Sequence, residues 1–240
     1  MRTKSFPGAI FKLLRCFIVC YCLFHQQKCC IFVGEMIREK AIEDDILRRL
    51  SRKGRGQIFF AQRFYDKWQE SSVRFTLSEM AKSGKIARLA RGVYCYPKLT
   101  EHGMKMIIPD ADAIARAVAK KAKVRIAPYG DHAAYLVGLT GLLISSTTYI
   151  TDGVTRRIRL SGGRDIVFIH TSELRIFAFT NEIMQLISNA VRAIGKDRIG
   201  DYEREVLKWR LDSVPAQDFA ADLMLCPEWV RDLLLDLKVN

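Results

Sequence analysis

Serine and basic side chains share the exposed front of a helical stretch at residues 71–83. Four of them recur at helical spacing, namely Ser71, Arg74, Ser78 and Lys82, and Ser72 stands beside them at the start of the helix. Hydroxyl and guanidinium groups in such an arrangement can form hydrogen bonds with base edges in the major groove, and lysine neutralises phosphate. The pattern predicts direct contact with double-stranded DNA.

A basic hairpin follows at once, in the stretch KIARLARGVYCYP at residues 85–97. Two β-like runs meet at Arg91-Gly92, where glycine allows the positive φ of a tight turn. Arg91 at the bend and Arg88 before it are predicted to contact a minor groove or phosphates. A hairpin that contacts protein, with arginines that are merely solvated, is the alternative.

A second group of arginines lies at Arg156, Arg157 and Arg159, within a predicted strand. Arg157 and Arg159 share one strand face because side chains alternate with a period of two. This face is expected to extend the DNA contact, or to receive an acidic or RNA partner, or to be a solvated edge.

Other chemistry finds little support in the sequence. A nuclease site needs an Asp/Glu-x-Lys pair on a strand, yet the single such triplet, residues 236–238, falls in a predicted C-terminal helix. The histidines and cysteines lack metal or triad spacing, and Asp152 reads as a turn residue. We therefore expect no catalytic residue, no cofactor and no metal.

The charge points the same way, since the chain of 240 residues has a formal net charge of +13. The excess lies between residues 36 and 196, whereas residues 197–240 hold six Lys/Arg and ten Asp/Glu. Such a balance indicates a polyanionic partner, most often nucleic acid.

The polar helix face at 71–83 and the basic hairpin at 85–97 must be positioned by the elements around them, and the order of those elements can be predicted. Residues 36–53 place Ile37, Ala41, Ile42, Ile46 and Leu50 at helical spacing, and a short strand and a short helix follow at 57–69. Ser71 or Ser72 can cap the next helix. Phe75 on its exposed face is expected either to contact a thymine methyl or to pack on the preceding helix. Helix, short helix, helix and basic hairpin predict a winged helix-turn-helix domain over residues 36–103.

Residues 104–240 are expected to form a second, α+β domain. Helices at 110–121 and 131–137 flank a strand at 123–127, and three strands at 147–151, 156–161 and 165–170 are joined by tight turns. Predicted helices follow at 180–194, 200–211, 215–224 and 228–237. The fold class is α+β, with a small mixed sheet and a helical C-terminus.

The first 35 residues differ from the rest. They hold five of the seven cysteines, and their apolar run of nine residues, CFIVCYCLF, is too short for a bilayer span. Because an amphipathic helix opens at Met36, residues 1–35 are expected to be a non-native N-terminal extension. With those residues set aside the sequence shows no targeting segment, and no membrane partner is expected. The two remaining cysteines, Cys95 and Cys226, are isolated, which suggests a reducing cytoplasm.

The stretch LSEMAKSGKIARLARGVYCYP resembles the N-terminal winged helix of the AbiEi antitoxin family. The matching positions are Leu77, Gly84, Ile86, Arg91, Gly92, Val93, Tyr94 and Pro97. Later stretches, among them IIPDADAIARAVAKK and CPEWVRDLL, are similar to a second domain found in related bacterial proteins. The sequence departs from that group at Tyr135, within the stretch AAYLVGLT, and in the run TGLLIS that begins at its last residue.

The resemblance implies a transcriptional repressor and antitoxin of a type IV toxin–antitoxin system that acts in phage defence. Such a protein binds inverted repeats in its own promoter, and its functional partner is a nucleotidyltransferase-like toxin that need not form a stable complex with it. An orphan winged-helix regulator and, less favoured, a nucleic-acid-processing enzyme remain alternatives.

Overall fold

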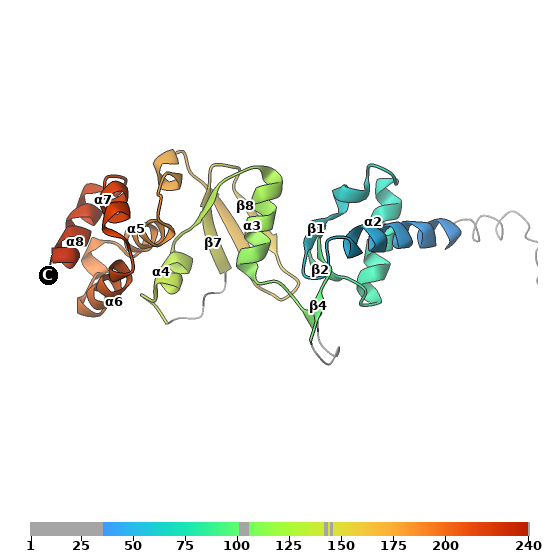
Figure 1. Cartoon of the computed structure of the whole chain (residues 1–240), viewed down its shortest axis with the longest axis horizontal. Coiled ribbons are helices and arrows are strands. Elements are labelled where there is room, and N and C mark those ends of the chain that lie inside the picture. Colours follow the sequence, from blue (N-terminus) through green and yellow to red (C-terminus); the bar gives the residue numbers. More distant parts are fainter. Residues whose placement is uncertain (1–35, 101–105, 142–143, 145, 240) are drawn as a thin grey trace, which may run out of the picture.

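The computed structural model describes residues 36–100, 106–141, 144 and 146–239. Three parts follow one another along its long axis: an N-terminal domain, a central sheet with helix α3, and a group of C-terminal helices (Figure 1). The expected α+β class is confirmed. The proposed extension, residues 1–35, and the predicted boundary at 103 and 104 lie outside the described residues.

The N-terminal domain has the predicted winged-helix order. A helix covers residues 36–51, and five elements follow it: β1 (Ile58–Phe60), the 3-10 helix η1 (Ala61–Phe64), α2 (Glu70–Lys82), β2 (Ala87–Ala90) and β3 (Val93–Cys95). The three strands form an antiparallel sheet in the order β1-β3-β2. The β2-β3 hairpin therefore stands where a wing belongs.

The core of this domain lies between the helices and one face of the sheet. Ile42, Ile46 and Leu50 are fully buried beside Phe64 and Leu77. The helical spacing also predicted burial of Ile37 and Ala41, and both are exposed. Those two residues lie in the first turns of the described helix, and they are absent from the cluster that contains its later residues.

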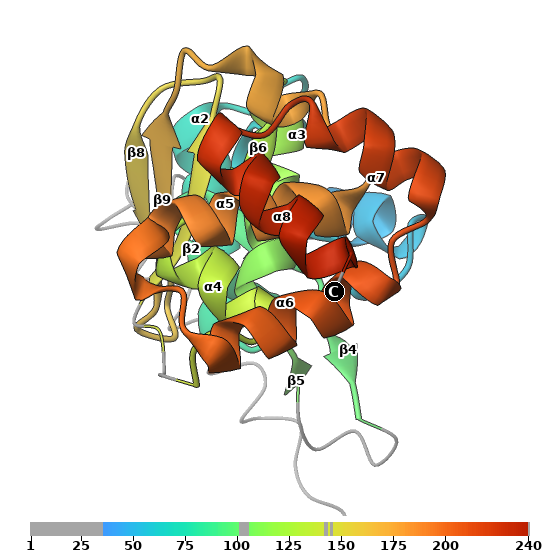
Figure 2. The same ribbon diagram turned by 90° about the vertical axis from the view of Figure 1, so that its left-hand side faces the viewer.

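The central part is a mixed sheet, as expected. Its order is β6-β7-β9-β8, with β7 and β9 parallel and the outer pairs antiparallel. The bounds of the elements are α3 (Ala111–Ala122), β6 (Ile126–Pro128), α4 (Asp131–Val137), β7 (Ser146–Thr151), β8 (Arg156–Arg159) and β9 (Asp165–His170). A ribbon of β4 (Lys98–Leu99) and β5 (Met106–Ile107) extends away from the sheet (Figure 2).

The two helices of this part begin differently. Asp110 caps α3, since its side chain accepts from the Ala113 amide at 2.8 Å, whereas Asp131 is the first residue of α4 and does not cap it. Asp152 lies in a turn that is not a β7-β8 hairpin, because β9 stands between those strands. Its carboxylate instead accepts from the backbone and the side chain of Arg125, both at 2.8 Å.

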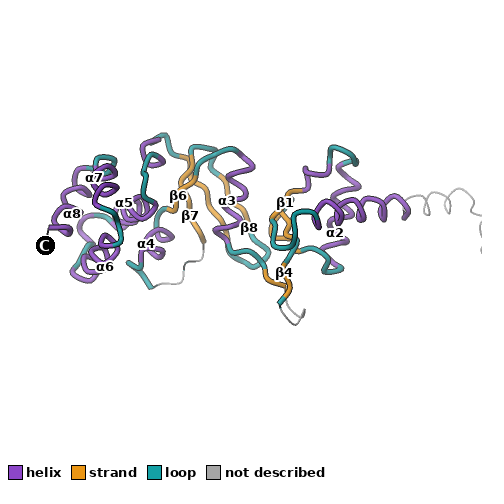
Figure 3. Tube along the Cα trace, viewed as in Figure 1, coloured by secondary structure: helices purple, strands orange, loops and turns teal. Residues whose placement is uncertain are grey.

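The C-terminal part is helical throughout (Figure 3). After the 3-10 helix η2 (Leu174–Phe177) come α5 (Glu182–Ile194), η3 (Lys196–Arg198), α6 (Asp201–Asp212), α7 (Ala216–Leu223) and α8 (Glu228–Val239). Fully buried Met184, Ile187, Leu207 and Val230 tie these helices together. No helix in the described ranges is long and apolar enough to cross a membrane.

The N-terminal domain and the central part share a core. The second face of the β1-β3-β2 sheet buries Val93 and Cys95 in one cluster with Ile114, Tyr149 and Phe168. Hence the three-stranded sheet lies between its own helices and α3, as the position of α3 next to β1 indicates (Figure 1).

Candidate nucleic-acid interface

Helix α2 presents the polar face that its sequence predicts. Ser71 and Arg74 are exposed, Ser72 and Ser78 are partly exposed, and the Lys82 side chain is 70% exposed. Phe75 on the same face is 51% exposed, so of the two expected placements it adopts the solvent-facing one. The face thus combines hydroxyl, guanidinium and aromatic groups, a set that suits base edges and thymine methyls.

The start of α2 differs from the expectation. The N-cap is Gln69, which provides no side-chain cap, so Ser71 and Ser72 lie inside the first turn. The helix begins two residues earlier than a Ser71 cap would place it, and Glu70 therefore lies at the positive end of the helix, where a carboxylate is favoured. Neither serine hydroxyl is used as a cap as a result.

The two cations of α2 are paired with carboxylates in the free protein. Arg74 forms an ion pair with Glu70 and donates to the Tyr65 hydroxyl at 3.2 Å, and Lys82 lies 2.7 Å from Glu79. Exposed pairs of this kind contribute little stability. A DNA phosphate can therefore replace either carboxylate at small cost.

The hairpin turn is short and lies against neighbouring elements. Gly92 has φ 74°, as the tight turn requires, and its carbonyl accepts from the Ala61 amide at 3.3 Å. Arg88 and Arg91 are exposed, whereas Ala90 and Val93 are buried in the core shared with the central part. The hairpin is consequently both the wing and the joint to the second domain.

The arginines of β8 are divided between the two faces of the sheet. Arg156 lies over the Phe168 ring, with its guanidinium carbon 5.0 Å from the ring centroid. Arg157 and Arg159 are exposed on the opposite face, and Arg157 pairs with Asp165 at 3.4 Å. The expected common face of Arg157 and Arg159 is present, but Arg156 is not part of it.

Arg156 instead meets the wing. A groove of about 250 Å³ is lined by Arg91 and Gly92 of the hairpin, Lys121 at the end of α3, and Arg156. Lys121 Nζ donates to the Gln62 Oε1 atom at 2.5 Å. Burial and the Arg156 charge together lower the pKa of the Lys121 ammonium. Arg91 of the N-terminal domain lines the same groove, so cations from both domains gather here.

The sequence offers two neighbouring lysines, Lys120 and Lys121, in the last turn of a predicted helix as possible phosphate contacts. The sequence cannot show which of the two lysines faces the wing, because the side of a helix that meets another domain depends on tertiary packing.

Groups that could carry other chemistry are engaged in the fold. His132 is buried with Nδ1 3.2 Å from the Thr148 carbonyl, and Lys238 donates to the Leu211 carbonyl at 3.0 Å. Burial raises the pKa of the Cys95 thiol to about 11, so it stays protonated near neutral pH. Among the described residues no three His, Cys, Asp or Glu side chains gather as metal ligands.

Comparison with known proteins gives one match. A family model described as "Family of unknown function (DUF6088)" matches residues 45–216. The matched range covers most of the described chain, from the N-terminal helix through the start of α7, and includes every candidate DNA-contacting residue. Neither a curated protein nor a solved structure matches.

Proposed function

The chain belongs to the DUF6088 family of unknown function, and we propose that this member is a DNA-binding transcriptional repressor and antitoxin. It acts in the bacterial cytoplasm, binds inverted repeats in its own promoter and counters a nucleotidyltransferase-like toxin, as in type IV, AbiE-like systems. The toxin partner rests on the resemblance of the hairpin stretch to the AbiEi family. The DNA-binding part rests on geometry as well.

One observation supports DNA binding above all others. The exposed face of α2 bears Ser71, Arg74 and Ser78 on a helix that is held rigidly from behind by Val73, Leu77 and Met80, each no more than 1% exposed. A rigid helix with a polar, partly basic front beside a basic hairpin is the arrangement that winged helices insert into a major groove.

The test compares duplex DNA from upstream of the gene with a shuffled duplex of the same composition. We expect the double variant Arg74→Ala/Ser78→Ala to weaken binding to the upstream duplex by about 1–3 kcal/mol for each base that is no longer contacted. Its affinity for the upstream duplex should then be close to its affinity for the shuffled duplex. Fluorescence anisotropy at fixed salt measures both affinities.

Arg204→Ala is the matched control, because Arg204 is also an exposed, ion-paired arginine, 2.8 Å from Asp236 in the C-terminal part. It should leave both affinities unchanged. Equal affinity of the unmodified protein for the two duplexes would reject a sequence-reading repressor. A separate growth assay, with the adjacent gene product supplied from a foreign promoter, tests the antitoxin part.

A further inference from the structure

A second basic groove lies in the N-terminal domain, away from the hairpin. It has a volume of about 520 Å³, and its lining consists of ionisable side chains alone: Asp45, Arg48, Arg49, Arg52, Lys53, Arg63 and Lys67. The lining residues come from the C-terminal half of the 36–51 helix and its end, and from η1 and the turn that leads to α2. None of them belongs to α2, the hairpin or β8.

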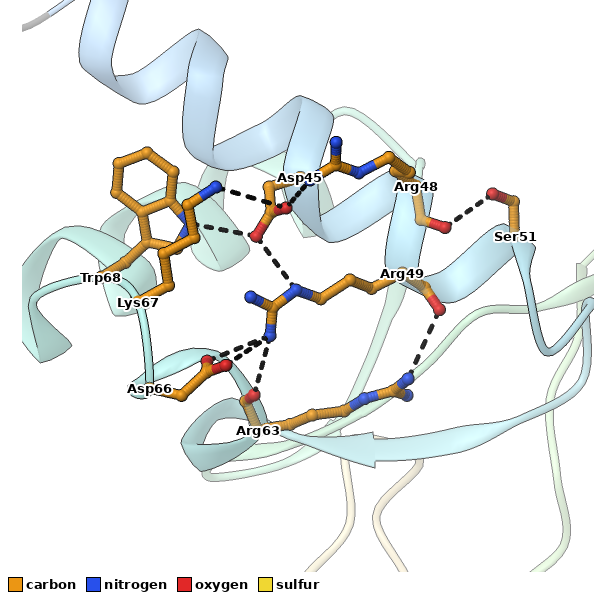
Figure 4. Close-up of polar contacts among 8 residues, drawn as sticks. All are labelled: Asp45, Arg48, Arg49, Ser51, Arg63, Asp66, Lys67 and Trp68. Carbon is orange, nitrogen blue, oxygen red and sulfur yellow. Dashed lines mark hydrogen bonds and ion pairs between the residues drawn. The ribbon is translucent and has the colours of Figure 1, made fainter.

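Buried Asp45 organises one wall of the groove (Figure 4). Its carboxylate is only 3% exposed, and it pairs with Arg48, with Arg49 Nε at 3.1 Å and with Lys67 Nζ at 3.7 Å. Trp68 Nε1 also donates to it, at 3.1 Å. One carboxylate thus fixes the positions of three cations while neutralising only part of their charge.

Arg49 has a second carboxylate partner, Asp66, at 3.0 Å. The cations of the groove that do not contact Asp45 have no carboxylate partner among the described residues. Arg63 donates to neutral acceptors, the Gln57 side chain at 3.2 Å and the Arg49 carbonyl at 3.4 Å. Arg52 and Lys53 are exposed and have no ion pair in the part of the chain that the structure describes.

Six cations against the carboxylates of Asp45 and Asp66 leave four positive charges unbalanced in one concavity. Such a cluster repels itself unless an anion occupies it, and arginine forks match the oxygen geometry of phosphate. The groove also adjoins the recognition helix, since Lys67 precedes the α2 N-cap, Gln69, by two residues.

We propose that this groove binds phosphates of the DNA backbone beside the segment that α2 reads. The proposal rests on the proposed DNA-binding function and adds a contact surface to it. An acidic protein partner fits less well, because protein interfaces have an apolar or aromatic centre that is depleted in lysine, and no apolar side chain lines the groove. Protein–DNA interfaces are polar and strongly positive.

The experiment uses the full chain and the double variant Arg52→Ala/Lys53→Ala. Both side chains are exposed, so their removal should leave the fold intact, as circular dichroism checks. Binding to the upstream duplex and to the shuffled duplex is measured across a salt series. The slope of log K against log salt should flatten by about 0.9 for each phosphate that is no longer neutralised, equally for both duplexes, because phosphate contacts carry no sequence information.

Two further variants sharpen the comparison. Lys196→Ala/Arg198→Ala removes the same charges from exposed positions in the C-terminal part and should keep the original slope. Arg52→Lys/Lys53→Arg keeps the charge and should restore most of the slope.

The outcomes separate this proposal from the proposed function. An unchanged slope in the alanine variant, with Arg74→Ala still weakening upstream binding, overturns the phosphate groove alone and leaves an acidic protein surface as its partner. A flattened slope with equal affinity for both duplexes supports the groove and rejects the sequence-reading repressor. The absence of duplex binding at any salt overturns both.

Discussion

At the scale of single residues, Asp45 shows how a buried charge supports an exposed basic surface. Burial raises the pKa of its carboxyl, but the hydrogen bonds from Trp68 and Arg48 and the charges of Arg49 and Lys67 outweigh burial, so the pKa lies below its usual value. A depressed pKa means that the ionised carboxylate stabilises the folded state above the unfolded pKa of about 4. That stability is lost as the pH falls through the folded-state pKa.

Replacement of Asp45 by asparagine should therefore have a pH-dependent cost. Asp45→Asn leaves its three cations without their shared counter-charge, and we expect the free energy of unfolding at pH 7 to fall by about 1–3 kcal/mol. The difference from the unmodified protein should shrink as the pH falls from about 4 through the lower folded-state pKa, because the unmodified carboxylate protonates over that range. Urea denaturation at a series of pH values measures this.

Asp44→Asn serves as the control, since Asp44 is the exposed neighbour on the same helix. It should change the free energy of unfolding by less than about 0.5 kcal/mol at any pH. A destabilisation by Asp45→Asn that does not depend on pH would contradict the role of the ionised carboxylate.

At the scale of elements, strand β8 places cations on two faces that should behave differently. Arg156 shares a groove with Arg91 and Lys121, whereas Arg159 is exposed on the opposite face of the same strand. If DNA lies along the wing, only the first face is close to it. We expect Arg156→Ala to flatten the salt dependence of duplex binding by about 0.9 in the log–log slope.

Arg159→Ala is the matched control from the same strand and should leave the slope as it was. The reverse result, with Arg159 effective and Arg156 silent, would place DNA on the outer face of the sheet. Equal effects of the two variants would indicate a general influence of net charge instead of a contact.

The elements themselves were largely predictable from sequence, because their signals are local. The period of Val73, Leu77 and Met80 predicts the buried face of α2, and Gly84 and Gly92 mark turns that need positive φ. The N-cap of α2 was harder to predict. Serine is the better capping residue, but the N-cap is Gln69, because the start of a helix also depends on the chain before it.

The arrangement of the site was less predictable, for a physical reason. Alternation along β8 separates Arg157 from Arg156, but no local pattern shows that β9 inserts between β7 and β8 or that Lys121 faces the wing. The groove around Asp45 likewise joins residues up to 22 positions apart, from Asp45 to Lys67. Such contacts depend on tertiary packing, which a single sequence does not display.

At the scale of the whole molecule, the shared core joins the domains more tightly than the predicted division suggests. The wing strands contribute Leu89, Val93 and Cys95 to the same cluster as Ile114 and Val118 of α3. Ser161 adds hydrogen bonds across the joint, with its amide 2.8 Å from the Leu89 carbonyl and its hydroxyl 2.8 Å from that of Arg88. A wing fixed in this way holds Arg91 in place relative to Arg156.

We therefore expect the two ends of the molecule to unfold together, although multidomain proteins often do not. The three tryptophans supply the probes: Trp68 lies in the N-terminal domain, and Trp209 and Trp229 lie in the C-terminal helices. Tryptophan-to-phenylalanine variants make each end visible by fluorescence. The decisive change is Val118→Ala, which removes two methyl groups at a position only 5% exposed in the joint.

Removal of this packing should destabilise the protein by about 1–3 kcal/mol and lower the midpoint of thermal unfolding seen by both sets of tryptophans by the same amount. Ile37→Ala, at a position 67% exposed, should move neither midpoint. If Val118→Ala lowers only one midpoint, the joint does not couple the domains. In that case the wing and β8 can move independently, and the combined effect of Arg91 and Arg156 on DNA binding should be no greater than that of two separate surface charges.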